Sequence, residues 1–211
     1  MDEIPVTIAA IESVGSDAIS IQFETPAGFS AEPGQFLKLT MTVDDETVSR
    51  FYTLSSPDVT GTFEMTIGID PDGELTPQLR ALEPGDDVVL SGPYGNAYYE
   101  GEQSVLLLAG GPGIGPAVGI AERTLDDGGE ATIIYQDDEP LHESRLAELQ
   151  ERGAFVTVIA DEKPLTEAVP SEAVIETQVF VYGFADFLDD AMSAITAAGG
   201  EPDTAKVENF G

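Results

Sequence analysis

The sequence predicts a protein of two domains, an antiparallel Greek-key β-barrel followed by a parallel α/β sheet. Its 211 residues are enough for two domains of ordinary size. Short β-branched segments separated by turn sequences fill about the first hundred residues, as in small antiparallel barrels. Beyond Gly101, continuous apolar segments alternate with helical ones, which is typical of a parallel sheet covered by helices. We therefore expect the barrel over residues 1–100 and the α/β domain over residues 101–211.

The barrel strands are predicted from short alternating or β-branched segments, separated by turns such as Pro71-Asp72-Gly73. One helix is expected among them at residues 76–82, with Thr76 as its N-cap and Pro77 as its first helical residue. Arg50 and Tyr52 are expected to share one face of a further strand that stops before Pro57. The remaining strands are predicted at residues 6–8, 19–23, 36–39, 63–67 and 87–90.

The α/β domain is predicted from apolar runs of strand length and from helical stretches that alternate with them. Ligands of such sheets bind at the carboxyl ends of the strands. Residues 205–211 are expected to form an edge strand. The other strands are predicted at residues 105–109, 131–135, 155–159 and 179–182, and the helices at residues 116–124, 142–152 and 185–198.

The charge of the chain is strongly acidic. Its 8 basic and 40 acidic residues give a formal net charge of −32, and the acids are spread over every segment. Nucleic acid and anionic membrane surfaces are therefore disfavoured as partners, because both require a basic footprint. A dispersed acidic surface favours adaptation to concentrated salt, in which screening suppresses self-repulsion.

Cysteine is absent, which excludes disulfides and cysteine-ligated zinc or iron–sulfur centres in this chain. The carboxylates are too numerous for any pair to mark a metal site. No apolar run reaches the length of a membrane span, and Met1-Asp2-Glu3 is unlike the basic start of a signal peptide. We expect a cytoplasmic protein. The single histidine, His142, is interpreted as a solvated residue at a helix start.

Three segments have the composition of a nucleotide site. In Arg50-Phe51-Tyr52-Thr53 a guanidinium is available for phosphate, an aromatic ring for stacking and a hydroxyl for hydrogen bonding. Gly73-Glu74-Leu75-Thr76 is either a plain helix start or one whose free amides bind phosphate. The glycine-rich loop at residues 109–116 lies between a strand and a helix, and it is either structural or a place where a pyrophosphate approaches the backbone.

In order and spacing, these segments resemble the ferredoxin–NADP reductase family of flavoproteins over essentially the whole chain. Arg50 to Ser56 is similar to the flavin motif R-x-Y-S/T-x-x-S, and Gly73 to Thr76 to the pyrophosphate turn G-x-x-S/T. Further similar segments are Pro33-Gly34-Gln35-Phe36, Gly92-Pro93-Tyr94-Gly95, the glycine loop Gly110 to Pro116, and Val207-Glu208-Asn209-Phe210 at the end of the chain.

The resemblance implies an FAD-dependent reductase that takes hydride from NADH or NADPH. Electrons then pass to a separate acceptor, which is a ferredoxin, another redox protein or a small molecule. By resemblance, Arg50 and Thr76 bind the FAD diphosphate and Tyr52 stacks on the flavin ring. Thr53, Tyr182 and Phe210 are the implied catalytic residues, with Thr53 near flavin N5. The full set implied to bind cofactors is Arg50, Phe51, Tyr52, Thr53, Ser56, Gly73, Leu75, Thr76, Gly110, Gly111, Gly113, Ile114, Pro116, Asp137 and Phe210.

The sequence departs from the family pattern on the nicotinamide side. Pro112 replaces the Thr or Ser of the nucleotide loop, and Tyr182-Gly183-Phe184 stands where many members have Cys-Gly-Pro. These departures motivate an alternative, an FAD-binding electron-transfer or regulatory subunit without nicotinamide activity. The acids after the strand at residues 131–135 are either part of the acidic surface or a coenzyme site. In the second case Asp137 above all favours NADH, because an acid can bind the ribose hydroxyls and repel a 2′-phosphate.

Overall fold

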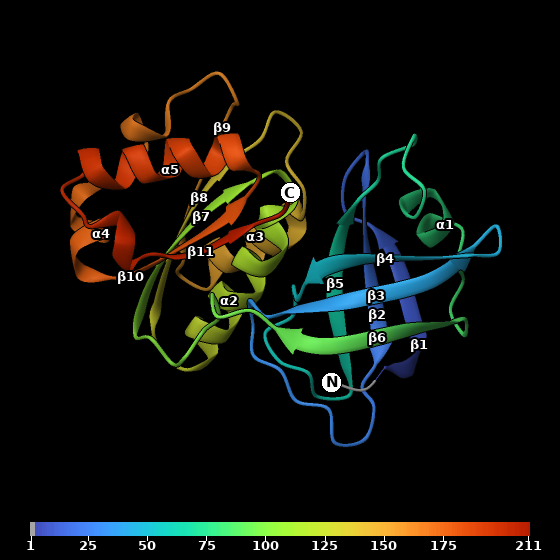
Figure 1. Cartoon of the computed structure of the whole chain (residues 1–211). Coiled ribbons are helices and arrows are strands. Elements are labelled where there is room, and N and C mark those ends of the chain that lie inside the picture. Colours follow the sequence, from blue (N-terminus) through green and yellow to red (C-terminus); the bar gives the residue numbers. More distant parts are fainter. Residues whose placement is uncertain (1–2) are drawn as a thin grey trace.

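In the computed structural model, which describes residues 3–211, a β-barrel is followed by a parallel sheet with helices on both of its faces (Figure 1). The predicted fold class is confirmed. Met1 and Asp2, considered above for a signal peptide, lie outside the described residues. Within residues 3–211, no helix is long and apolar enough to cross a membrane.

The barrel is built from six antiparallel strands in the order β4-β3-β6-β1-β2-β5. A bridge between Leu54 and Met65 connects the end of β4 to β5, so the two edges of the sheet meet. Alternate residues point inward, and Ile21, Phe23 and Met65 are fully buried. The strands are β1 (Ile4–Ser13), β2 (Ala18–Glu24), β3 (Phe36–Val43), β4 (Glu46–Thr53), β5 (Thr62–Gly68) and β6 (Asp87–Tyr94), with the short helix α1 (Thr76–Arg80) between β5 and β6.

The second domain is a five-stranded parallel sheet in the order β11-β10-β7-β8-β9. Its strands are β7 (Ser104–Gly110), β8 (Glu130–Gln136), β9 (Phe155–Ile159), β10 (Gln178–Gly183) and β11 (Lys206–Asn209). Its helices are α2 (Ile114–Asp126), α3 (Glu143–Glu151), α4 (Ser171–Glu176) and α5 (Ala185–Ala197), and short 3-10 turns lie at Gly111–Gly113, Leu165–Glu167 and Pro202–Thr204.

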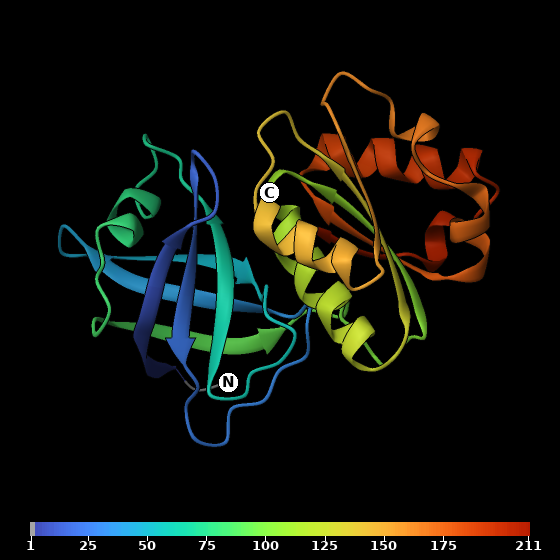
Figure 2. The same cartoon turned by 180° about the vertical axis from the view of Figure 1, so that it is seen from behind.

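The central strand β7 explains why residues 105–109 are continuously apolar. Val105 and Leu107 point into the core beneath α2 and α3, whereas Leu106 and Leu108 point into the core beneath α4 and α5. Both faces of the sheet are thus covered, and Figures 1 and 2 show α2 and α3 on the side that faces the barrel. Because β6 ends at Tyr94 and β7 begins at Ser104, we propose a domain boundary at residues 100–101.

The structure confirms one predicted element, corrects the start of a second and adds a helix that was not predicted. The edge strand expected at residues 205–211 is confirmed as β11, which pairs with β10. Helix α1 begins at Thr76 with Leu75 as its N-cap, so the prediction of Thr76 as N-cap was wrong: its hydroxyl bonds the main chain of Asp70. Helix α4 was not predicted, because its six residues are too few to show a helical period.

Candidate functional site

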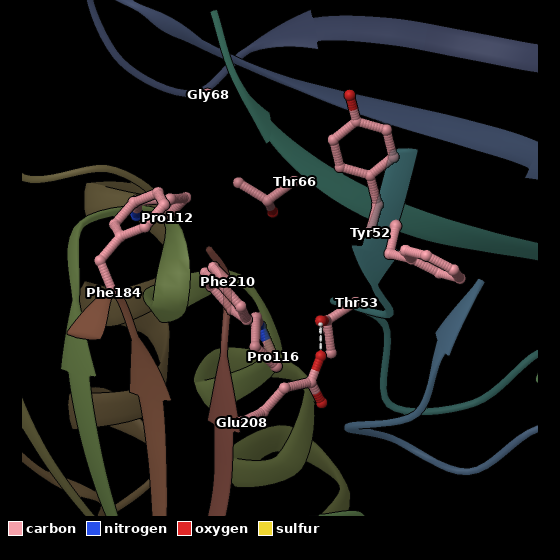
Figure 3. Close-up of a pocket in the computed structure, with 10 residues that line it drawn as sticks. Tyr52, Thr53, Thr66, Gly68, Pro112, Pro116, Phe184, Glu208 and Phe210 are labelled. Carbon is pink, nitrogen blue, oxygen red and sulfur yellow. Dashed lines mark hydrogen bonds between the residues drawn. The ribbon is translucent and has the colours of Figure 1, made fainter. Parts of the chain in front are cut away.

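A cleft of about 170 Å³ lies where the two domains meet, and residues from both line it. The barrel contributes the end of β4 and part of β5. The α/β domain contributes the glycine loop and the carboxyl ends of β10 and β11 (Figure 3). The lining residues are Phe51, Tyr52, Thr53, Thr66, Gly68, Pro112, Pro116, Phe184, Glu208 and Phe210.

The hydroxyl of Thr53 connects the two domains at this cleft. It donates a hydrogen bond of 2.8 Å to Oε1 of Glu208, as Figure 3 shows. The other carboxylate oxygen of Glu208, Oε2, is buried and has no hydrogen-bond partner among the described residues. Burial raises the pKa of Glu208 to about 7, against a smaller lowering by the Thr53 hydrogen bond. The cleft therefore contains a carboxyl group that can hold or release a proton near neutral pH.

Two aromatic side chains of β4 border the cleft in different ways. Tyr52 packs partly against the barrel core, and burial raises its pKa to about 12. Phe51 points to the other face and is 61% exposed, in edge contact with Phe36 and Tyr94. An exposed aromatic ring beside a cleft is available for stacking against a planar ligand.

Arg50 lies beside the turn before α1, as the nucleotide-site interpretation requires. Its Nη2 is 3.6 Å from Oε2 of Glu74, and both side chains are more than half exposed. Such a pair contributes little stability, so Arg50 is free to exchange Glu74 for an anionic ligand. Leu75 in the same turn is buried in the barrel core, which fixes the turn against the barrel.

The glycine loop between β7 and α2 turns sharply at Gly111, whose φ is +54°. A Cβ on Gly113 would lie 2.1 Å from the carbonyl oxygen of Tyr182, so only glycine permits this approach. Ile114 is fully buried. Pro116 reaches the cleft from the first turn of α2.

Phe210 closes the cleft from the end of the chain. Its amide donates to the carbonyl of Gly183, and its ring stands edge-on to Phe184 at 6.1 Å between centroids. The structure thus brings Phe51, Tyr52, Thr53, Pro116 and Phe210 of the predicted site into one cleft.

Other predicted site residues lie away from the cleft. Tyr182 is fully buried, and its hydroxyl bonds the carbonyl of Ala97 in the segment between the domains. The Ser56 hydroxyl accepts a hydrogen bond from the amide of Glu64. Asp137 lies at the carboxyl end of β8 beside Gly111 and Pro112, in a second hollow between the domains. Gly110 is covered by the ring of Phe187.

Five of the lining residues were not predicted as site residues from the sequence: Thr66, Gly68, Pro112, Phe184 and Glu208. Glu208 is one of 40 acids, and its only signal was its position two residues before Phe210. The interpretation of His142 as a solvated helix residue was wrong. His142 is the N-cap of α3 and has a φ of 54°. It is only 4% exposed, because its ring packs against Thr66 of the barrel.

The first domain is similar to proteins of known function. Residues 5–99 match the family model of the oxidoreductase FAD-binding domain. The chain is 31% identical over 132 residues to a human NADH-cytochrome b5 reductase-like protein, covering 60% of this chain and 42% of that protein. It is 36% identical over 116 residues to the glycine betaine monooxygenase reductase subunit of Chromohalobacter salexigens, covering 53% of this chain and 32% of that protein. The chain thus spans less than half the length of these curated relatives.

The fold is also that of solved reductases. A ferredoxin NADP+ reductase from Neisseria gonorrhoeae, solved with FAD and NADP bound, superposes over 100% of both chains with a TM-score of 0.80 at 16% identity. The first domain is therefore an oxidoreductase FAD-binding domain, and the parallel α/β domain follows it as in these reductase structures. The resemblance to the ferredoxin–NADP reductase family is thus confirmed by the match of residues 5–99 and by the shared two-domain fold.

Proposed function

We propose that the protein is an FAD-dependent reductase, which transfers hydride from NAD(P)H to the flavin and electrons on to a separate acceptor such as a ferredoxin. The observation that carries this proposal is the cleft itself. It joins the flavin-motif residues Tyr52 and Thr53 to the nucleotide loop at Pro116 and to Phe210 at the chain end. Relatives named as reductase subunits of oxygenases support a separate acceptor.

The residues present fit FAD. Arg50 is the cation next to the turn at Gly73 and Thr76, and its exposed pair with Glu74 is readily exchanged for a diphosphate. Tyr52 and Phe51 offer aromatic surface at the cleft. The unpartnered Oε2 of Glu208 offers a buried acceptor there. A bound FAD would supply a ring that accepts hydride and releases electrons singly.

The protein's own side chains would orient the reactants and control protons. Thr53 is held in place by Glu208, and its hydroxyl oxygen can still accept a hydrogen bond. Glu208, with a pKa raised to about 7 by burial, would hold a proton close to Thr53 near neutral pH. The rings of Phe184 and Phe210 cover the cleft on the α/β side and would exclude water.

We propose that NADH binds at the carboxyl ends of β7 and β8, with Asp137 next to its ribose. We further propose a cytoplasmic protein adapted to concentrated salt, supported by the net charge of −32 and the absence of cysteine. The same charge disfavours nucleic acid and anionic membranes as partners.

A second candidate function is an FAD-binding electron-transfer or regulatory subunit that does not use NAD(P)H. It is favoured by the ring of Phe187, which packs over Gly110 and Gly183 at the carboxyl ends of two central strands. Pro112 also has no hydroxyl, whereas the resemblance to the family leads us to expect Thr or Ser at this position. Such packing would narrow the space for a nicotinamide.

Rapid mixing of the purified protein with NADH and with NADPH distinguishes the two candidates. Loss of the flavin absorbance on mixing supports the reductase. A protein that retains FAD but is reduced only by dithionite supports the binding subunit. A protein that purifies without flavin and takes up none when FAD is added contradicts both.

A further inference from the structure

A cluster of polar side chains joins the domains directly behind the cleft. His142 and Arg145 contribute to it from the α/β domain, together with Glu122 of α2. Ser55, Glu64 and Thr66 contribute from the barrel. We refer to these six residues as the interdomain clamp. Thr66 also lines the cleft, and the proposed function gives a role to none of the six.

Arg145 is the centre of the clamp. Its guanidinium makes a two-point contact with the carboxylate of Glu122, with both distances 2.8 Å. It also donates to Oε1 of Glu64 at 2.8 Å and to the carbonyl oxygen of Ser55 at 2.6 Å. The side chain is only 19% exposed, so these contacts are shielded from water. One planar group therefore fixes helix α2, strand β5 and the turn after β4 relative to one another.

His142 adds a second connection, through a chain of hydrogen bonds. Its Nε2 lies 2.7 Å from Oγ1 of Thr66, which in turn donates to Oγ of Ser55 at 3.0 Å. Because Thr66 donates its proton to Ser55, the ring must donate from Nε2. Burial, and secondarily the charge of Arg145, lowers the pKa of His142 to about 3, so the ring is neutral at physiological pH.

Helix α2 lies so close to Thr66 of β5 and to Ser55 after β4 that only glycine fits at two of its positions. A Cβ on Gly115 would lie 2.7 Å from Cβ and Oγ1 of Thr66, and one on Gly119 would lie 2.9 Å from the main chain of Ser55. The neighbour of Gly115, Pro116, lines the cleft, and so does Thr66. The clamp thus holds two opposite walls of the cleft, one from each domain.

We propose that His142 and Arg145 are positioning residues for hydride transfer: they fix the α/β domain against the barrel so that the two walls of the cleft keep their spacing. This inference rests on the proposed reductase function. Hydride transfer needs the reacting atoms within about 3–3.5 Å of each other, and a misplacement of about 1 Å can lower a rate about 100-fold. A rigid contact behind the cleft meets that requirement.

The absence of cysteine allows the domain arrangement to be measured directly. Spin labels on Thr47→Cys in β4 and Asp190→Cys in α5, both at exposed positions, would report the distance between the domains by pulsed dipolar spectroscopy. This background would be combined with Arg145→Met, Arg145→Lys, His142→Ala and His142→Gln. The matched control is Arg152→Met, because Arg152 pairs with Asp126 within the α/β domain at 2.6 Å.

We expect Arg145→Met and His142→Ala to broaden the interdomain distance distribution and to slow flavin reduction by NADH about 10- to 100-fold. Their FAD content should equal that of the unsubstituted protein. His142→Gln keeps a side-chain donor and should restore most of the rate, whereas Arg145→Lys loses the two-point contact and should not. Arg152→Met should change neither measurement.

The proposal would be overturned if the interdomain distance distribution were as narrow in Arg145→Met and His142→Ala as in the unsubstituted protein. It would also be overturned if that distribution broadened but NADH reduced the flavin at the same rate. If Arg145→Met does not fold, the proposal is tested with Arg145→Lys, His142→Ala and His142→Gln by the same two measurements. If the unsubstituted protein binds FAD but is not reduced by NADH or NADPH, the proposed function fails. The distance distributions would then still show whether the clamp holds the domains.

Discussion

The hydroxyl of Thr53, at the end of β4, donates a 2.8 Å hydrogen bond to Glu208 in β11, 155 residues further along the chain. This contact joins the barrel to the last strand of the α/β domain at the floor of the cleft. Glu208 is therefore held by a residue of the flavin motif, while its second oxygen has no hydrogen-bond partner within residues 3–211. The arrangement has a measurable consequence for stability.

The first prediction concerns the pH dependence of folding through Glu208. Its pKa is raised by burial from 4.5 to about 7, so the native state favours the protonated form. The stabilisation from this group is fully present below its unfolded pKa and is lost as the pH rises through 7. Relative to Glu208→Gln, the free energy of unfolding should fall by about 2 kcal/mol between about pH 5 and about pH 8.

Urea denaturation of both proteins in concentrated KCl measures this difference, and the comparison cancels the contribution of the other carboxylates. Thr53→Val provides a further check, because the Thr53 hydrogen bond lowers the pKa of Glu208. In that variant the loss of stability should continue to a higher pH, because the pKa of Glu208 in the folded state is higher while its unfolded value is unchanged. A difference between the parent and Glu208→Gln that stays constant with pH would show that Glu208 ionises normally.

The second prediction concerns FAD affinity. Arg50→Ala should weaken FAD binding by about 2–3 kcal/mol, because it removes a charge-assisted contact to phosphate. Titration of the apoprotein with FAD, near the dissociation constant of the parent protein, measures the loss. Arg80→Ala is the matched control, since Arg80 is an exposed arginine in the last turn of α1. Equal FAD affinity in Arg50→Ala and Arg80→Ala would remove Arg50 from the site.

The sequence predicted the barrel and the sheet well because their signals are local. The run at residues 105–109 is apolar throughout, since β7 is buried on both faces, and this is visible without any structure. The position of Phe210 followed from a motif at the chain end. The spacing of motifs along the chain was thus sufficient to predict a site residue wherever that residue belonged to a motif.

Contacts between distant segments could not be predicted in this way. Tyr182 was expected beside the nicotinamide because Tyr182-Gly183-Phe184 stands where many family members have Cys-Gly-Pro. Its side chain is instead buried in the core, and its hydroxyl donates to the carbonyl oxygen of Ala97. His142 was expected in water, because nothing near it in the sequence reveals that Thr66 of the barrel lies against its ring. Both residues depend on how the domains pack, and one sequence carries no period or motif for that packing.

The third prediction concerns salt. With a net charge of −32, repulsion among carboxylates opposes the compact state whenever screening is weak. The screening length falls from about 10 Å at 0.1 M salt to about 3 Å at 1 M, so the melting temperature should rise over that range of KCl. Sucrose at equal osmolarity leaves the charges unscreened and should raise the melting temperature less. An equal effect of both solutes would argue against adaptation to salt.

The last prediction is a preference for NADH over NADPH that depends on the charge of Asp137. Its side chain accepts hydrogen bonds from the Tyr135 hydroxyl at 2.9 Å and from the amide of Glu139 at 2.8 Å, which fixes it at the end of β8. Burial, followed by repulsion from Asp138 and Asp137, raises the pKa of nearby Asp161, so this region is strongly negative. Arg145 cannot neutralise it, because its guanidinium is held in the interdomain clamp.

The ratio of kcat/KM for NADH to that for NADPH, measured in concentrated KCl, tests this preference. Asp137→Asn keeps an acceptor for Tyr135 but removes the charge, and it should lower the ratio about tenfold, equivalent to about 1.4 kcal/mol. Lys163→Gln is the matched control, because Lys163 lies in the loop that the Gln136 side chain contacts at the end of β8. A parent protein that prefers NADPH would contradict the prediction. So would a ratio that changes in Lys163→Gln but not in Asp137→Asn, because the coenzyme would then be selected by the lysine.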